Sequence, residues 1–286
     1  MRTLYEGFTR VRCLVATVAV GVLMATVTST GSAAAADSPS DNGVPRPKII
    51  GGMYVTPGDF PATTAIQSTG ASGSESCSGT LIGHHWVVTA AHCVFPLTER
   101  TTTVHVGSVD RTGGEVAKAV AVYRHPSYNS GGAAGPFDVG LLKLDHDVAA
   151  PPAFLGPRVQ PVRSAFRVLI AGWGRTCNDP SPACEPPVRL KSLYTYVLPP
   201  ETCNRPPGGF RPDIELCTAS ATFGSPCQGD SGGPVWADYQ NGRGVLIGAI
   251  SRGSAPACGF SDTIATDLTA PPISDWIRGV LQGPSG

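Results

Sequence analysis

The stretch TFGSPCQGDSGGPVW, residues 222–236, is unusually rich in glycine around a single serine. Three glycines surround Ser231 within it, namely Gly229, Gly232 and Gly233. Pro234 follows them at once. Glycine permits a positive φ and close backbone approach at an entropic cost, whereas proline fixes φ and removes a hydrogen-bond donor. The stretch therefore predicts an irregular, tightly held turn that presents one serine hydroxyl.

A serine hydroxyl is a weak nucleophile unless a base accepts its proton, and that base needs a third group to hold its tautomer. VVTAAHCV, residues 87–94, places His92 at the end of an apolar run. PFDVGLLKL, residues 136–144, places Asp138 directly before another apolar run. Each residue alone is more often a surface, core or turn residue. Their joint occurrence with Ser231 predicts a Ser-His-Asp triad.

The composition favours an all-β protein. Short β-branched runs alternate with Gly and Pro, which is typical of many short strands. Apolar residues at helical spacing in ISDWIRGVL, residues 273–281, predict one C-terminal helix. The 21 basic and 21 acidic residues cancel, so we expect neither nucleic acid nor a membrane surface as a partner.

The first 48 residues are predicted to lie outside the folded domain. Residues 1–36 combine an arginine-containing start, an uncharged apolar run of 15 residues from Cys13 to Val27, and small residues before the cut. The alternative, a membrane span, needs roughly 20 apolar residues. We therefore expect a signal peptide and a secreted, extracellular protein. Residues 37–48 are polar and rich in Pro and Ser, which predicts a propeptide ending at Lys48.

Cleavage after Lys48 would leave residues 49–286, enough for one domain built from two small barrels. The stretch DVAAPPAFLGPRVQP, residues 147–161, interrupts the strand pattern. It divides the domain into halves of about 49–155 and 156–286.

Eight cysteines remain after the signal peptide, and an extracellular setting favours disulfides. Three pairs each enclose a short segment that can close locally: Cys77 with Cys93, Cys177 with Cys184, and Cys203 with Cys217. Elimination then pairs Cys227 with Cys258, although an even count does not by itself define connectivity. The sequence lacks clustered ligands at metal-binding spacing, so we expect no metal and no cofactor.

The sequence resembles the trypsin and chymotrypsin family of serine endopeptidases from Ile49 to about Leu281. The motifs that carry the resemblance are IIGG, TAAHC, DVGLLKL, GWG, GDSGGP and ISRG. The order His, Asp, Ser is also that of the family. The resemblance implies two six-stranded antiparallel β-barrels with the active site in the cleft between them. It also implies a monomer that hydrolyses polypeptides through an acyl-enzyme and meets protein inhibitors.

The resemblance assigns a role to each residue of the motifs. His92 would be the general base and then the general acid, Asp138 would orient it, and Ser231 would attack the scissile carbonyl. The backbone N–H groups of Gly229 and Ser231 would form the oxyanion hole. Ser251, within ISRG, would give Asp138 a further hydrogen bond.

Asp230, beside the nucleophile, needs a partner because an unpaired buried carboxylate is costly. The resemblance implies that this partner is the α-ammonium group of Ile49, exposed when an activating protease cuts the zymogen after Lys48. The alternative is that Asp230 only caps its own turn.

Substrate preference in the family depends on the residue six positions before the nucleophile, here Ser225 rather than Asp. The resemblance therefore implies an uncharged residue, hydrophobic or small, before the scissile bond. Gly253 would leave one pocket wall open. Two registers remain for the opposite wall: Thr263 facing inward would shorten the pocket, whereas Asp262 facing inward would favour basic residues.

Three features depart from the family pattern. Pro226 lies beside the pocket base, and Arg252 replaces the common Trp of the strand that aligns substrate. The third is the pair Cys177 and Cys184, which would form a local bridge without a counterpart in the family. In addition, the stretch VDRTGGEVAK, where some relatives bind calcium, holds only Asp110 and Glu115, so we expect no required calcium.

Two other functions are compatible with such a chain. One is a catalytically inactive protease-like binding protein, and the other is a secreted esterase that uses the same triad. The presence of all three triad residues and of the glycines favours the endopeptidase.

Overall fold

The computed structural model describes residues 49–283, apart from short gaps at 71–72, 96–100, 130, 132, 158–165, 178–183, 204–208, 221–223 and 241–242. The predicted signal peptide and propeptide, residues 1–48, lie outside the described residues. Within the described part of the chain, no helix has the length and apolar character needed to cross a membrane.

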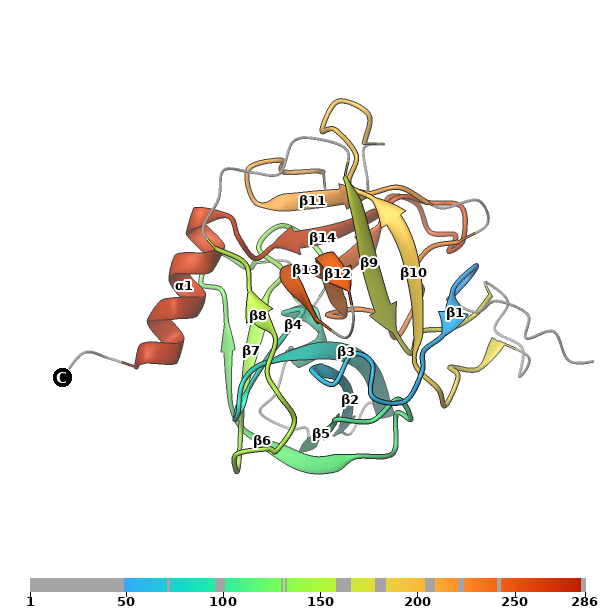
Figure 1. Ribbon diagram of the computed structural model, residues 1–286. Coiled ribbons are helices and arrows are strands. Elements are labelled where there is room, and N and C mark those ends of the chain that lie inside the picture. Colours follow the sequence, from blue (N-terminus) through green and yellow to red (C-terminus); the bar gives the residue numbers. More distant parts are fainter. Residues whose placement is uncertain are drawn as a thin grey trace, which may run out of the picture. The chain divides into compact units, whose positions relative to one another are not determined.

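The first half of the domain is a closed six-stranded barrel in the order β2-β3-β4-β7-β6-β5 (Figure 1). All neighbouring pairs are antiparallel. The strands are β2 (Thr63–Gly70), β3 (Gly73–Gly83), β4 (Trp86–Thr89), β5 (Thr101–Val106), β6 (Glu115–Arg124) and β7 (Gly140–Leu144). In β5, alternate residues Thr102, Val104 and Val106 are buried, which is the period-two pattern of a strand with one face in the core.

The second half is a sheet of eight strands in which β1-β10-β9-β12-β13-β14-β11 form a continuous path. Its strands are β1 (Met53–Tyr54), β8 (Phe154–Leu155), β9 (Arg167–Gly172), β10 (Lys191–Tyr196), β11 (Glu215–Thr218), β12 (Pro234–Gln240), β13 (Arg243–Gly253) and β14 (Thr263–Asp267). A bridge between Val197 and Thr218 joins the end of β10 to β11. The six strands from β10 to β11 therefore form the expected second barrel.

Two short strands extend this second barrel. β1 belongs to the first half of the sequence but pairs with β10. β8 pairs with β13 in parallel, so the sheet is not purely antiparallel. These strands attach the start of the domain and the segment between its halves to the second barrel.

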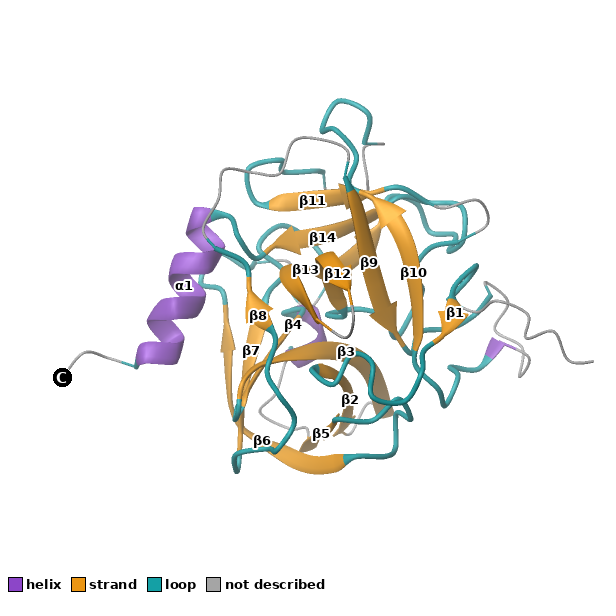
Figure 2. Ribbon diagram, viewed as in Figure 1, coloured by secondary structure: helices purple, strands orange, loops and turns teal. Residues whose placement is uncertain are grey.

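The predicted C-terminal helix is α1 (Pro271–Gln282), drawn in purple and labelled in Figure 2. It begins two residues before the predicted segment because Pro271 and Pro272 occupy its first turn, where an N–H group is not needed. Ile273 and Ile277 are buried in a core shared with first-barrel residues. The rings of Trp276 and His125 pack edge to face, with their centroids 5.2 Å apart.

All four predicted disulfides are present, joining Cys77 to Cys93, Cys177 to Cys184, Cys203 to Cys217, and Cys227 to Cys258. The first connects β3 to the short 3-10 helix η1 (His92–Val94) that carries His92. It therefore ties the segment that bears His92 to the neighbouring strand.

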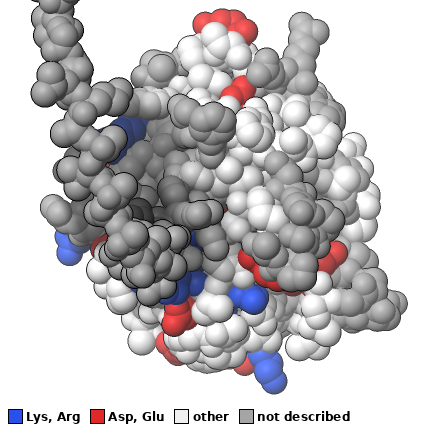
Figure 3. All heavy atoms as spheres, turned by 90° about the vertical axis from the view of Figure 1, so that its right-hand side faces the viewer, with Lys and Arg blue, Asp and Glu red and all other residues white. Residues whose placement is uncertain are grey.

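On the face drawn in Figure 3, basic and acidic side chains of the described residues are interspersed. This mixture is consistent with the equal numbers of both signs in the sequence. On this face they do not separate into one basic and one acidic region.

Replacing Ile277 by Ala is expected to lower the free energy of unfolding by about 2–5 kcal/mol, because it leaves a cavity beneath α1. Arg278→Ala, at a neighbouring side chain that is 42% exposed, is the matched control and should change it by less than about 0.5 kcal/mol. Equilibrium denaturation measures both. Equal effects of the two variants would contradict the packing of α1 on the core.

Candidate active site

Antiparallel strand pairing brings His92 and Asp138 together. Thr89 at the end of β4 pairs with Gly140 at the start of β7. His92 follows β4 by three residues, and Asp138 precedes β7 by two, so both lie at the same end of this strand pair. The two residues are 46 positions apart in sequence but are neighbours in the barrel.

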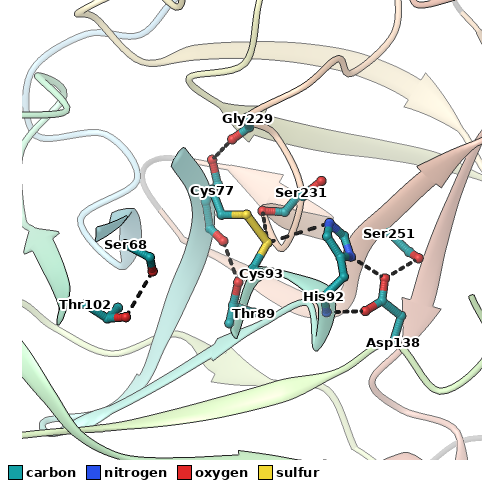
Figure 4. The surroundings of a disulfide bond; sticks show 11 residues. Ser68, Cys77, Thr89, His92, Cys93, Thr102, Asp138, Gly229, Ser231 and Ser251 are labelled. Carbon is teal, nitrogen blue, oxygen red and sulfur yellow. Dashed lines mark hydrogen bonds and ion pairs between the residues drawn. A yellow bond between two sulfur atoms is a disulfide. The ribbon is translucent and has the colours of Figure 1, made fainter. Parts of the chain in front are cut away.

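The carboxylate of Asp138 is fully buried and accepts three hydrogen bonds (Figure 4). Its Oδ2 accepts from His92 Nδ1 at 2.7 Å and from Ser251 Oγ at 2.6 Å. Its Oδ1 accepts from the backbone N–H of His92 at 2.9 Å. Because an ionised carboxylate only accepts, Nδ1 carries the proton and Nε2 is left as the free acceptor of the neutral ring.

Neighbouring residues fix the backbone around Asp138. The hydroxyl of Thr266, on β14, donates to the Asp138 carbonyl at 2.9 Å. Phe137 has a φ of 59°, a left-handed conformation that is unfavourable for a bulky residue. Its ring stacks on that of His125, with the ring centroids 4.7 Å apart, and this packing holds the strained residue in place.

The serine turn is held against both barrels. Gly232 N donates to Ile250 O at 2.7 Å, and Ile250 N donates to Gly233 O at 2.9 Å, which attaches the turn to β13. From the first barrel, Ser78 N donates to Ser231 O at 2.8 Å and Ser78 Oγ donates to Gly229 O at 2.9 Å.

The glycines of the opening stretch are required by this geometry. Gly232 has a φ of 77°, and a Cβ there would overlap Ser78 O and Thr89 Oγ1. Gly229 has a φ of 101°. Neither conformation is accessible to an ordinary side chain at low cost.

Ser231 lies next to His92. The sulfur of Cys93 is 3.8 Å from His92 Nε2 and 3.7 Å from Ser231 O. Figure 4 shows His92 between Ser231 and Asp138. Among the described residues Ser231 Oγ makes no hydrogen bond to Nε2. Such bonds are often long without substrate and shorten when it binds.

Two backbone donors beside the nucleophile are available. Within the described ranges, neither Gly229 N–H nor Ser231 N–H donates a hydrogen bond. These are the two groups that the family resemblance implies for an oxyanion hole.

Asp230 is fully buried and accepts from two backbone groups, Gly174 N at 2.7 Å and Cys227 N at 2.9 Å. Burial raises the pKa of its carboxyl to about 6, although these two N–H groups and the charge of Lys191 act in the opposite direction. The Ile49 nitrogen of the uncleaved chain is an uncharged amide, so the predicted ion pair is not formed in this state.

A cavity of about 290 Å³ opens beside Ser231. Gly253 and Thr263 line it, but Ser225 does not. The Ser225 hydroxyl is buried, accepts from Gly259 N at 2.7 Å and donates to Pro226 O at 3.2 Å. The side chain that was expected to face the substrate is therefore hydrogen-bonded to backbone groups instead.

The structure also shows whether Thr263 or Asp262 faces the cavity on the opposite wall. Thr263 lines the cavity, whereas Asp262 does not, and its Oδ1 accepts from Ser220 N at 3.1 Å. Ser261 lines the cavity as well, and its Oγ lies 3.0 Å from the place that a Cβ on Gly253 would take. Sequence reasoning missed Ser261 because the register of residues 258–268 depends on the pairing of β14 with β13.

Among the described residues, one group of side chains has its potential metal-ligand atoms close together. Cys77, His92 and Cys93 have ligand atoms within 4.8 Å of one another, but the two sulfurs are joined in a disulfide. Glu115, one of the two acidic residues considered for calcium, already accepts from Ala149 N at 2.8 Å.

Comparison with solved structures defines the class of the protein as the chymotrypsin fold. Human heparin binding protein is 24% identical, with a TM-score of 0.65, over 82% of this chain and 98% of that one. Mouse neuropsin, described as a serine protease, is 25% identical, with a TM-score of 0.66, over 80% and 98%.

The sequence model of the family described as Trypsin matches residues 49–277, so the chain belongs to the trypsin family. Trypsin 5G1 of Aedes aegypti is 29% identical over 242 residues, covering 82% of this chain and 85% of that protein. Transmembrane protease serine 9 of Rattus norvegicus is 31% identical over 251 residues, which are 82% of this chain and 22% of that protein. The protein is a serine endopeptidase, a hydrolase that acts on polypeptides.

The raised pKa of Asp230 predicts a pH dependence of stability in the uncleaved chain. Its folded pKa of about 6 exceeds the ordinary value of 3.8, so the folded state binds the extra proton between these values. The stabilisation of the folded state by this proton is complete below about pH 4 and is lost as the pH rises through about 6. The loss lowers the free energy of unfolding by on the order of 3 kcal/mol.

Asp230→Asn stays neutral and should flatten this part of the stability profile, measured by chemical denaturation from pH 4 to 7. Asp275→Asn, at a side chain of α1 that is 52% exposed, is the control. An unchanged slope in Asp230→Asn would show that another group causes it.

Proposed function

We propose that this protein is a secreted endopeptidase that acts through Ser231, His92 and Asp138, is made as a zymogen, and cleaves after a small uncharged residue. The observation that carries the proposal is the buried Asp138 carboxylate, which accepts hydrogen bonds from His92 Nδ1 and Ser251 Oγ. This arrangement leaves His92 Nε2 facing Ser231 as a base of defined tautomer.

In the proposed reaction, Ser231 Oγ attacks the scissile carbonyl carbon while His92 Nε2 accepts its proton. The N–H groups of Gly229 and Ser231 stabilise the negative carbonyl oxygen of the tetrahedral intermediate. The imidazolium, stabilised by Asp138, then donates the proton to the leaving amine, and an acyl-enzyme remains. Water, deprotonated by His92, hydrolyses this ester and restores the serine.

The proposed activation step is cleavage between Lys48 and Ile49. It would create an α-ammonium group whose pairing with Asp230 replaces a buried, partly protonated carboxyl by an ion pair. Asp230 lies between Gly229 and Ser231, so its position affects both proposed oxyanion donors. Secretion would follow from the signal peptide proposed for residues 1–36.

The proposed preference for a small uncharged residue follows from the cavity lining. Among the described residues that line it none is acidic, so no countercharge for a basic substrate residue is present. Ser261 opposite Gly253, together with Thr263, narrows the space available to a side chain.

The alternative is a binding protein that performs no turnover. It is worth testing because a structural neighbour of the same fold is named for heparin binding. An active-site label separates the two functions.

A fluorophosphonate label is expected to react with Ser231 strongly only after cleavage at Lys48 by a lysine-specific protease. Lys48→Gln, which that protease cannot cut at this bond, should remain unlabelled, and Ser231→Ala should never react. Asp138→Asn in the cleaved chain should lower kcat about 10⁴-fold because the tautomer of His92 is lost. A correctly cleaved, folded chain that does not react would favour the binding protein.

Gly253→Ala is expected to reduce kcat/KM for peptides with Phe before the scissile bond about tenfold more than for peptides with Ala. The new Cβ would come within 2.9 Å of Ala255 O and 3.0 Å of Ser261 Oγ. Gly279→Ala, where a Cβ on α1 meets nothing within 4 Å, is the matched control. Equal losses for both peptides would contradict the assigned pocket wall.

A further inference from the structure

His125 is a buried histidine that the proposed reaction does not use. It follows β6 directly and is 6% exposed. Its Nδ1 accepts from Ser127 N at 3.2 Å, so Nε2 carries the proton of the neutral ring and donates to Pro272 O at 3.3 Å. Burial lowers the pKa of His125 and favours this neutral form, although the Pro272 carbonyl acts in the opposite direction. Because both ring nitrogens are hydrogen-bonded, the plane of the ring is fixed.

This fixed ring contacts the chain on both sides of Asp138. It stacks on the ring of Phe137, the residue before Asp138, with an angle of 17° between the two planes. The backbone N–H of His125 donates to the carbonyl of Val139, the residue after Asp138, at 3.1 Å. His125 therefore holds both neighbours of the residue that binds His92.

The backbone around Asp138 needs such support because it is strained. Val139 N donates to Phe137 O at 2.8 Å, which closes a three-residue turn with Asp138 at its centre. Phe137 opens this turn with a φ of 59°, a conformation that persists only where the surroundings hold it. If Phe137 relaxed to a negative φ, the turn would change direction, and the Asp138 carboxylate would move with it.

The other charged contact of the Phe137 ring is weaker. The guanidinium carbon of Arg211 lies 5.7 Å from the ring centroid, and this half-exposed side chain is also paired with Asp213. A cation–π contact at an exposed site contributes little, whereas two stacked, buried rings add a specific geometry to their burial. The stacking on His125 is therefore the contact that best explains how the strained conformation is held.

The ring of His125 in turn depends on α1. Pro272, in the first turn of the helix, supplies the carbonyl that Nε2 binds, and Trp276, one turn further on, packs its ring edge to face on that of His125. The contacts therefore run without a break from α1 through His125 and Phe137 to Asp138.

We propose that His125 is a positioning residue of the catalytic site: its ring, held by α1, keeps Phe137 in the left-handed conformation and so directs the Asp138 carboxylate at His92. The inference rests on the proposed function, because it concerns how Asp138 orients the base. A small displacement of Asp138 weakens the stabilisation of the imidazolium, which forms only during the reaction, and so affects kcat rather than substrate binding.

The test measures kcat and KM of the cleaved enzyme on one peptide substrate, with kcat expressed per Ser231 that a fluorophosphonate labels. His125→Leu fills a similar volume without a flat ring, and should lower kcat about tenfold while KM changes less than about twofold. His105→Leu is the matched control. His105 is a half-buried histidine of β5 whose Nδ1 also binds a backbone carbonyl, that of Gly113 at 3.3 Å, and its loss should leave kcat per labelled site unchanged.

Two further measurements separate positioning from a purely structural role. His125→Phe keeps a flat ring against Phe137, and should retain kcat to within about threefold. The ¹H NMR signal of His92 Nδ1–H, assigned by its absence in Asp138→Asn, reports the hydrogen bond to Asp138 directly. This signal should shift or disappear in His125→Leu and remain in place in His105→Leu.

The outcomes distinguish the two proposals. If cleaved wild type labels and turns over, then an unchanged kcat and an unchanged Nδ1–H signal in His125→Leu would overturn the role of His125 alone. If His125→Leu does not fold, a folded His125→Phe whose kcat falls tenfold or more overturns that role instead. Cleaved wild type that does not label would overturn the proposed function together with this inference.

Discussion

The buried carboxylate of Asp138 is the constraint on which the site depends. A charge without solvent must be compensated, and here three donors do so: His92 N–H, His92 Nδ1–H and Ser251 O–H. Ser251 comes from the second barrel, and so does Thr266, which binds the Asp138 carbonyl. Satisfying one charge therefore joins the two halves of the domain and at the same time fixes the orientation and tautomer of His92.

The nucleophile turn depends on a similar constraint across the same cleft. Ser78 of the first barrel binds the carbonyl oxygens of Gly229 and Ser231, while Asp230 is bound by backbone amides of the second barrel. Because the turn passes so close to Ser78, residue 232 has room for glycine alone. Close backbone packing, rather than flexibility, explains the glycines of the GDSGGP stretch.

Several elements could be predicted because their signals are local. Short β-branched runs between Gly and Pro predicted the strands, the helical spacing of Ile273 and Ile277 predicted α1, and short cysteine spacings predicted three of the disulfides. The residues of the cavity wall were harder to predict from the sequence. Ser225 was expected at the pocket base, but its hydroxyl is used by Gly259 and Pro226. The choice between Thr263 and Asp262 required a strand register that a one-residue shift reverses.

The all-β class, the cysteine pairs that close locally and the candidate Ser-His-Asp groups could be predicted from residue type and spacing along the chain, and the family resemblance added the two barrels and the role of each residue. The folded structure was needed to find which groups meet across the cleft: Ser78 with the nucleophile turn, and Thr266 with Asp138. These contacts join residues far apart in sequence. Their partners are set by strand register and barrel closure, and neither is encoded in any single short stretch.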